Sequence, residues 1–224
     1  GLNSTMLLIA FMSLMIPSLF HFVPTEHRGN DEQMLSMAVS ILLIAAYVLS
    51  LVFSLKTHSY LFRKEEKEEK AKWSRNTALV ILLVSTVALA LISEVFVGQV
   101  ESVAKNFGLT ELFIGAVIVA LVGNAAEHLA ALFFALKNDI DMSINVTVGS
   151  SLQVAMFVAP IAVIAGVVMN KPMDLVFTPF EVIAMFASVL IVNEMTTDAL
   201  CNWFEGAQLV IMYLIIAALF FFVR

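Results

Sequence analysis

Long apolar runs separated by short polar stretches dominate the chain. These runs are apolar on all sides, and a helix needs roughly 20 such residues to cross ~30 Å of hydrocarbon. Only helices and closed barrels satisfy their backbone groups inside a bilayer, and the runs are too long and alternate too poorly for barrel strands. We therefore predict an all-α polytopic membrane protein with about seven transmembrane helices, at residues 3–23, 35–56, 76–100, 110–136, 143–169, 175–196 and 205–223.

The prolines indicate where these helices end or bend. Pro24, Pro172 and Pro179 lie at or near predicted ends, where the missing N–H is best tolerated. Pro17 and Pro160 lie inside predicted spans, and we expect them to kink the helices.

Composition supports the membrane class and narrows the chemistry. The 224 residues are 61% hydrophobic and 13% charged, against about 25% charged residues in a soluble domain. A single cysteine, Cys201, excludes an intramolecular disulfide and a cysteine-based metal cluster within this chain. A net charge of −6 without a basic surface gives no reason to expect nucleic acid. The apolar start at Gly1, with no initiator Met, suggests that the sequence begins inside a longer protein.

Lysine and arginine are unevenly distributed between the two ends of the predicted spans. The linker 57–75, "THSYLFRKEEKEEKAKWSR", holds six of them, and Lys137 lies in a loop on the same side. The opposite loops carry only Arg28, Lys105 and Lys171. The positive-inside rule then predicts a cytoplasmic linker and an outside C-terminus, in the cell (plasma) membrane.

The stretch "KEEKEEK" (64–70) within this linker allows two interpretations. One is a regulatory, calcium-sensing segment. The other is a solvated helical extension in which Glu66 and Lys70 pair at i,i+4, and the even mixture of charges favours it.

Ionisable residues inside membrane spans are the main functional signal, because each is unfavourable by ~2.5–3.5 kcal/mol on insertion scales. The candidates considered are Glu94, Glu127, His128, Glu181 and Glu194. Glu181 and Glu194 lie near span ends, where solvation alone can explain them. Glu94, Glu127 and His128 lie deep.

The stretch "VGNAAEHLAA" (122–131) is the densest of these sites. Asn124, Glu127 and His128 stand at i, i+3 and i+4, which places them on one face of a helix. The small residues around them, Gly123 among them, let a neighbouring helix approach or let the backbone open and expose carbonyls. Glu127 has no cation partner in any span, so a functional role is favoured. A lone histidine such as His128 is more often a hydrogen-bonded supporting group than a ligand.

The following span adds neutral oxygen donors in "GSSLQ" (149–153). Ser150, Ser151 and Gln153, with Asn124 and Glu127, form an all-oxygen set that suits Ca²⁺ better than Zn²⁺ or Cu²⁺. Small polar residues in membrane helices also hold helices together, so this stretch alone is weak evidence.

One carboxylate does not neutralise a divalent cation in a low-dielectric site. We expect a second carboxylate, either Glu94 or a residue on a helix outside this chain. Ca²⁺ is expected as a transported substrate, with no cofactor.

Four stretches carry a resemblance to a known family. "GNAAEH" (123–128), "GSSLQ" (149–153), "FSLKTHSYLF" (53–62) and "NWFEGAQL" (202–209) resemble, in consistent order, segments of the Ca²⁺/H⁺ exchanger (CAX) family of the cation/Ca²⁺ exchanger superfamily. The sequence departs from the family pattern at helix starts, where Ala199, Cys201 and Ser36-Met37-Ala38 stand.

The resemblance implies an inverted-repeat exchanger fold. Residues 1–56 would be the last two helices of the first half, 57–75 a charged cytoplasmic linker, and 76–224 the whole second half of five transmembrane helices. The missing first-half helices, with their own Gly-Asn-x-x-Glu motif, would be partners, as would the lipid bilayer. A weak similarity between "LLIAAY" (42–47) and "QLVIMY" (208–213) is consistent with related halves.

The expected function is secondary active transport and not enzymatic catalysis, with cytosolic Ca²⁺ exchanged for H⁺ at paired buried glutamates. Three other functions stay open: a Na⁺- or K⁺-coupled Ca²⁺ exchanger, a cation channel and a membrane scaffold. The sequence also allows a homo-oligomer and transport of Mn²⁺ or Cd²⁺. The resemblance assigns metal binding to Gly123, Asn124, Glu127, Ser150 and Ser151, proton coupling to Glu127 and His128, and supporting hydrogen bonds to Gln153 and His128, with Glu94 less certain.

Overall fold

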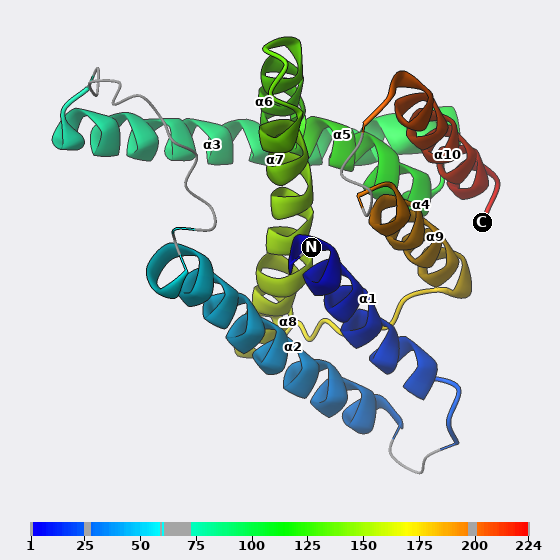
Figure 1. Ribbon diagram of the computed structural model, residues 1–224. Coiled ribbons are helices and arrows are strands. Elements are labelled where there is room, and N and C mark those ends of the chain that lie inside the picture. The colour runs from blue at the N-terminus through cyan, green and yellow to red at the C-terminus, as the bar shows by residue number, and fades with distance from the viewer. Residues whose placement is uncertain (1, 25–27, 59, 61–72, 197–200, 224) are drawn as a thin grey trace. The chain divides into compact units, whose positions relative to one another are not determined.

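The computed structural model describes residues 2–24, 28–58, 60, 73–196 and 201–223, which are helical with short connections and contain no strand (Figure 1). Most of the predicted linker, including "KEEKEEK", lies outside these residues, as does Ala199. The chain divides into two units: Gly1–Leu61 with Glu127–Met212, and Phe62–Ala126 with Tyr213–Arg224.

The first unit combines helices that precede the linker with helices that follow it. Two long helices precede the linker, and the remaining helices follow it. They are α1 (Leu2–Phe20), α2 (Arg28–Val52) with the π-helix η1 (Phe53–Thr57), α6 (Ala125–Leu136), α7 (Ile140–Gln153), η4 (Val154–Val158), α8 (Ala159–Val168), α9 (Pro179–Met195) and the first half of α10 (Trp203–Phe222).

The second unit contains one long helix, a helix of mixed type and the end of α10. Its elements are α3 (Arg75–Phe107), α4 (Glu111–Phe113), the π-helix η3 (Ile114–Val119) and α5 (Ala120–Gly123). Thr110 caps α4 and also donates from its hydroxyl to the Phe220 carbonyl of α10 at 2.6 Å. The side chains of α3 from Arg75 to Val95 are exposed, so that helix presents its apolar surface along most of its length.

The all-α polytopic class is confirmed. Among the described residues, five helices are long and apolar enough to cross a membrane, and six if the bent pair Glu111–Gly123 and Ala125–Leu136 forms one span. At 17 residues, α9 lies at the short end of the spanning range, so the count of seven stays a prediction.

The predicted span 175–196 begins too early, because residues 170–178 are not helical. The helix starts at Pro179, where Thr178 accepts a hydrogen bond from the Glu181 amide. Proline is well suited to the first turn, because its amide would have no helical partner there.

Pro160 shows how a membrane helix accommodates proline. It lies at the start of α8, directly after the π-helix η4. A π turn pairs each carbonyl with the amide five residues on, which suits a helix in which one residue supplies no N–H. The helix therefore changes type just before Pro160, and the expected kink there stays a prediction.

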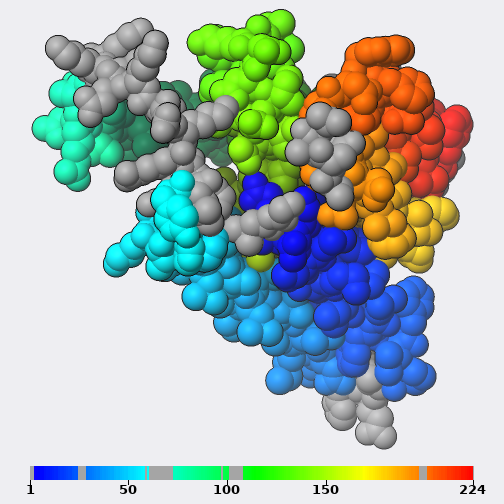
Figure 2. Space-filling model, viewed as in Figure 1, coloured from blue at the N-terminus to red at the C-terminus, as the bar shows by residue number. Residues whose placement is uncertain are grey.

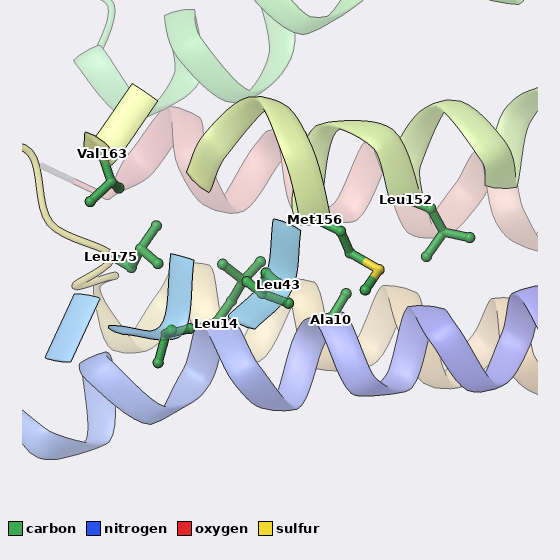
Figure 3. Packing of buried hydrophobic residues seen from close by; sticks show 8 residues of the cluster. Ala10, Leu14, Leu43, Leu152, Met156, Val163 and Leu175 are labelled. Atoms are coloured by element: carbon green, nitrogen blue, oxygen red, sulfur yellow. The ribbon is translucent and has the colours of Figure 1, made fainter. Parts of the chain in front are cut away.

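The core of the first unit lies where α1, α2, α7 and α8 meet. Val163 is fully buried, and Met156 and Leu175 are each 1% exposed (Figure 3). On another side α1 packs against α9 (Figure 2). The rings of Phe11 and Phe186 are centred 5.6 Å apart.

The extended connection 170–178, here called the connecting segment, returns the chain from α8 to α9. Asn170 adopts a positive φ of 55°, and the Lys171 amide donates to the Gly166 carbonyl at 2.8 Å. A Cβ at Gly166 would lie 2.7 Å from the Lys171 carbonyl oxygen. Only glycine therefore allows the segment to turn back this closely.

We predict that Gly166→Ala destabilises the protein by about 1–3 kcal/mol, the usual range for inserting a methyl group into packed structure. The melting temperature in detergent should fall by several degrees. Gly98→Ala in α3 is the matched control, since a Cβ there meets nothing within 4 Å and alanine favours a helix. Equal melting temperatures for the two variants would contradict the close approach.

Candidate functional site

The stretch "VGNAAEHLAA" breaks its helix at Asn124. The helix α5 ends at Gly123 and α6 begins at Ala125, with Asn124 between them. Asn124 itself has φ −101° and ψ 17°, outside the helical region. The expectation of one continuous helical face carrying Asn124, Glu127 and His128 is therefore wrong. The break agrees with the other possibility, that the small residues let the backbone open, while the exposed carbonyls stay a prediction.

Asn124 fixes the break with two hydrogen bonds to one acceptor. Its backbone amide donates to the Ala120 carbonyl at 3.1 Å, and its side-chain Nδ2 donates to the same oxygen at 2.9 Å. Because the amide nitrogen must face a carbonyl, the orientation of the side chain is defined. The Oδ1 atom is directed away from Ala120 and keeps its lone pairs for another donor or a cation.

The same four-residue pattern, a capping residue followed three positions later by glutamate, occurs at two other helix starts. At α9, the Thr178 amide donates to Glu181 Oε2 at 2.7 Å. At α10, the Asn202 amide donates to Glu205 Oε2 at 3.2 Å, and Asn202 Oδ1 accepts from the Glu205 amide. Both are capping boxes, in which the carboxylate satisfies the first amide of the helix. Glu181 is thus a cap, and the "NWFEG" stretch has a structural explanation.

Glu127 occupies the corresponding position of α6 but is used differently. It lies in the first turn of the helix and is partly exposed. It makes no hydrogen bond or ion pair with any residue that the structure describes, because Asn124 bonds backwards to Ala120 and not forwards. The positive end of the helix dipole favours a carboxylate there. The carboxylate of Glu127 is therefore available, unlike those of Glu181 and Glu205. The neighbouring His128 is exposed.

The neutral oxygen donors of α7 lie on the part of that helix that faces away from the core. Leu152 points into the core at 4% exposure, whereas Ser151 and Gln153 on either side of it are exposed and Ser150 is partly so. Ser151 donates its hydroxyl to the Thr147 carbonyl at 3.0 Å, which leaves its oxygen lone pairs outward. The hydrogen bond expected from Gln153 to Glu127 is absent among the described residues.

Within the described residues, no three His, Cys, Asp or Glu side chains gather closely enough to hold a metal ion. Glu127, His128, Ser150, Ser151 and Gln153 belong to the first unit. Gly123, Asn124 and Glu94 belong to the second, and Glu94 lies on the exposed part of α3. The role of Glu94 as second carboxylate stays a prediction.

The fold and these residues define a helical membrane protein with a carboxylate at a helix break that has no partner in the described part of the chain. The sodium/calcium exchanger protein family model matches residues 77–222. The chain is 42% identical to the Ca²⁺/H⁺ antiporter ChaA of Bacillus subtilis (strain 168) and 40% identical to the Ca²⁺/H⁺ antiporter of Aphanothece halophytica, over 98% of its length and 63% of theirs.

A solved structure shows the same fold. The structure of native YfkE matches with a TM-score of 0.81 at 39% identity, over 99% of this chain and 62% of that one. The chain therefore belongs to the sodium/calcium exchanger protein family, in its Ca²⁺/H⁺ exchanger branch. It spans slightly less than two thirds of the length of these relatives.

We predict that Asn124→Ala straightens the break between α5 and α6, because alanine favours the helix and lacks the amide that bonds to Ala120. Spin labels at positions 121 and 136, introduced after Cys201→Ser, report the change by pulsed electron resonance. Their backbone separation should lengthen toward about 22 Å, the length of 15 residues of straight helix. An unchanged distance distribution would show that Asn124 does not hold the break.

Proposed function

We propose that this chain is the larger part of a secondary active transporter that exports cytosolic Ca²⁺ in exchange for H⁺. The observation that carries the proposal is the contrast between three similar helix starts. Glu181 and Glu205 bond to their own capping residues, whereas Glu127 has no partner among the described residues. Support also comes from the names of the relatives, which are Ca²⁺/H⁺ antiporters.

The exchange would arise from competition at one carboxylate. A carboxylate away from water is poorly tolerated as a bare charge, and either a proton or a bound cation removes that penalty. Glu127 would bind Ca²⁺ or a proton, but not both, so that the two fluxes are coupled. His128, exposed beside it, would assist the proton transfer.

The remaining ligands would be neutral oxygens, as Ca²⁺ prefers. Asn124 Oδ1 and the carbonyls at the end of α5, near Gly123, are candidates because the helix break interrupts their regular bonding. Ser150 and Ser151 would contribute hydroxyl oxygens. Gln153, which does not bond to Glu127 in this structure, would orient the carboxylate once the ion is bound. A second glutamate, either Glu94 or one on a first-half helix, would complete charge neutralisation.

Alternating access would come from helices that move past the ion site. We propose α3 as one of these helices. The halves would form an inverted repeat. The charge distribution of the loops supports a cytoplasmic linker and an outside C-terminus, and the membrane would be the plasma membrane.

We predict that Glu127→Gln lowers proton-driven ⁴⁵Ca²⁺ uptake into inside-out vesicles at least tenfold, equivalent to ~1.4 kcal/mol or more. The amide retains the shape but carries no charge and does not titrate. Glu194→Gln, an exposed glutamate at the end of α9, is the control and should transport normally. Uptake by Glu127→Gln at the rate of the control would refute the proposed site.

The driving ion distinguishes the proposal from a Na⁺- or K⁺-coupled exchanger. We predict that ⁴⁵Ca²⁺ uptake follows an imposed pH gradient and disappears when a protonophore collapses it, because the proton is the competing ligand of the carboxylate. Substituting a Na⁺ or K⁺ gradient at equal pH should give no uptake. Uptake driven by either metal gradient would identify the other kind of exchanger, and uptake without any gradient of counter-ion would identify a channel.

A further inference from the structure

The connecting segment is held by two buried serines that come from helices on the other side of the linker. Ser36 of α2 is fully buried, and its Oγ accepts a hydrogen bond from the Leu175 amide at 3.1 Å. Ser18 of α1, 2% exposed, donates to the Leu175 carbonyl at 3.2 Å and accepts from the Phe177 amide at 2.9 Å. The two hydroxyls thereby satisfy three consecutive peptide groups of an extended backbone.

The side chain between these bonds fills the core. Leu175 is 1% exposed and shares a cluster with Leu14 of α1, Leu43 of α2 and Val163 of α8 (Figure 3). An extended backbone buried without partners would be strongly unfavourable, because each unmet amide or carbonyl carries its full desolvation penalty. The serine hydroxyls are therefore what allows Leu175 to enter this core.

Each serine bond joins a residue before the linker to a residue after it. The pairs are separated by 139, 157 and 159 positions in the sequence. Other buried hydroxyls in α2 behave differently: Ser40 is equally buried, yet it donates to the Ser36 carbonyl within its own helix at 2.7 Å. Ser36 and Ser40 thus form a natural comparison between a bond across the interface and a bond inside one helix.

We propose that Ser18 and Ser36 form the recognition site by which the α1–α2 pair binds the connecting segment, so that the parts of the chain before and after residues 61–72 associate without a covalent link. The partner is the extended backbone of residues 175–177 with its leucine side chain. The proposal concerns assembly and holds whichever ion is transported.

The test is to cut the full-length protein between residues 61 and 72 with a site-specific protease, after inserting its recognition sequence there. In mild detergent, the two fragments should co-purify through a tag on one of them. On heating, Ser36→Ala and Ser18→Ala should each release the other fragment at a temperature lower by roughly 5 °C than the unsubstituted cut protein. The cut Ser40→Ala protein should release it at nearly the unsubstituted temperature.

Release is measured by size-exclusion chromatography after each heating step, and the uncut variants are checked for a single monodisperse peak. If Ser36→Ala fails to fold when uncut, Ser18→Ala decides the outcome. Equal release temperatures for the Ser18, Ser36 and Ser40 variants would overturn the proposal, as would fragments that separate at once in the unsubstituted protein. Normal ⁴⁵Ca²⁺ transport bears on the proposed function alone, so the two proposals fail independently.

Discussion

The constraint on which this structure depends is that a backbone amide or carbonyl inside a bilayer finds no water and needs a partner in the protein. Regular helices satisfy this requirement with their own backbone hydrogen bonds. Side chains are needed only where a helix ends. At the Asn124 break, one carbonyl accepts both the backbone and the side-chain amide of the asparagine. Along the connecting segment, two serines replace the missing helical partners. At these places the polar side chains supply hydrogen bonds that the backbone groups lack.

Because most polar side chains bond to the backbone, only those that do not are available to bind an ion or a proton. Two glutamates at helix starts bond to the first amides of their own helices, and Ser40 and Ser151 bond to carbonyls one turn back. Glu127 alone of the three pattern glutamates is not used in this way among the described residues. A polar residue deep in the membrane is energetically unfavourable wherever it occurs. A functional role is indicated when its side chain, in addition, makes no hydrogen bond to the backbone.

Much of the fold can be predicted from the sequence, because the length of an apolar run depends only on consecutive residues and not on tertiary contacts. Every predicted span contains helix in the structure, although α2 begins at Arg28 where residue 35 is predicted, and α3 ends at Phe107 where residue 100 is predicted. The sequence pattern misses one feature and predicts another only as one of two alternatives. The apolar residues 175–177 look helical, and only the tertiary contact with Ser18 and Ser36 makes an extended conformation favourable there. The break at Asn124 had a local signal, since Asn followed three residues later by Glu is typical of a helix start, but the surrounding apolar run outweighed it.

The proposed exchange follows from the same constraint. An ionised carboxylate without a partner in a span is unfavourable by ~2.5–3.5 kcal/mol on insertion scales, which corresponds to a population lower by about a hundredfold. If Glu127 crosses between the two access states, its empty ionised form is suppressed by that factor, whereas the protonated and Ca²⁺-bound forms are not. Coupling of the two fluxes then needs no separate gate that senses occupancy. Glu127 has no partner among the residues that the structure describes, and this lack, unfavourable for stability, is what would make uncoupled return of the empty carrier rare.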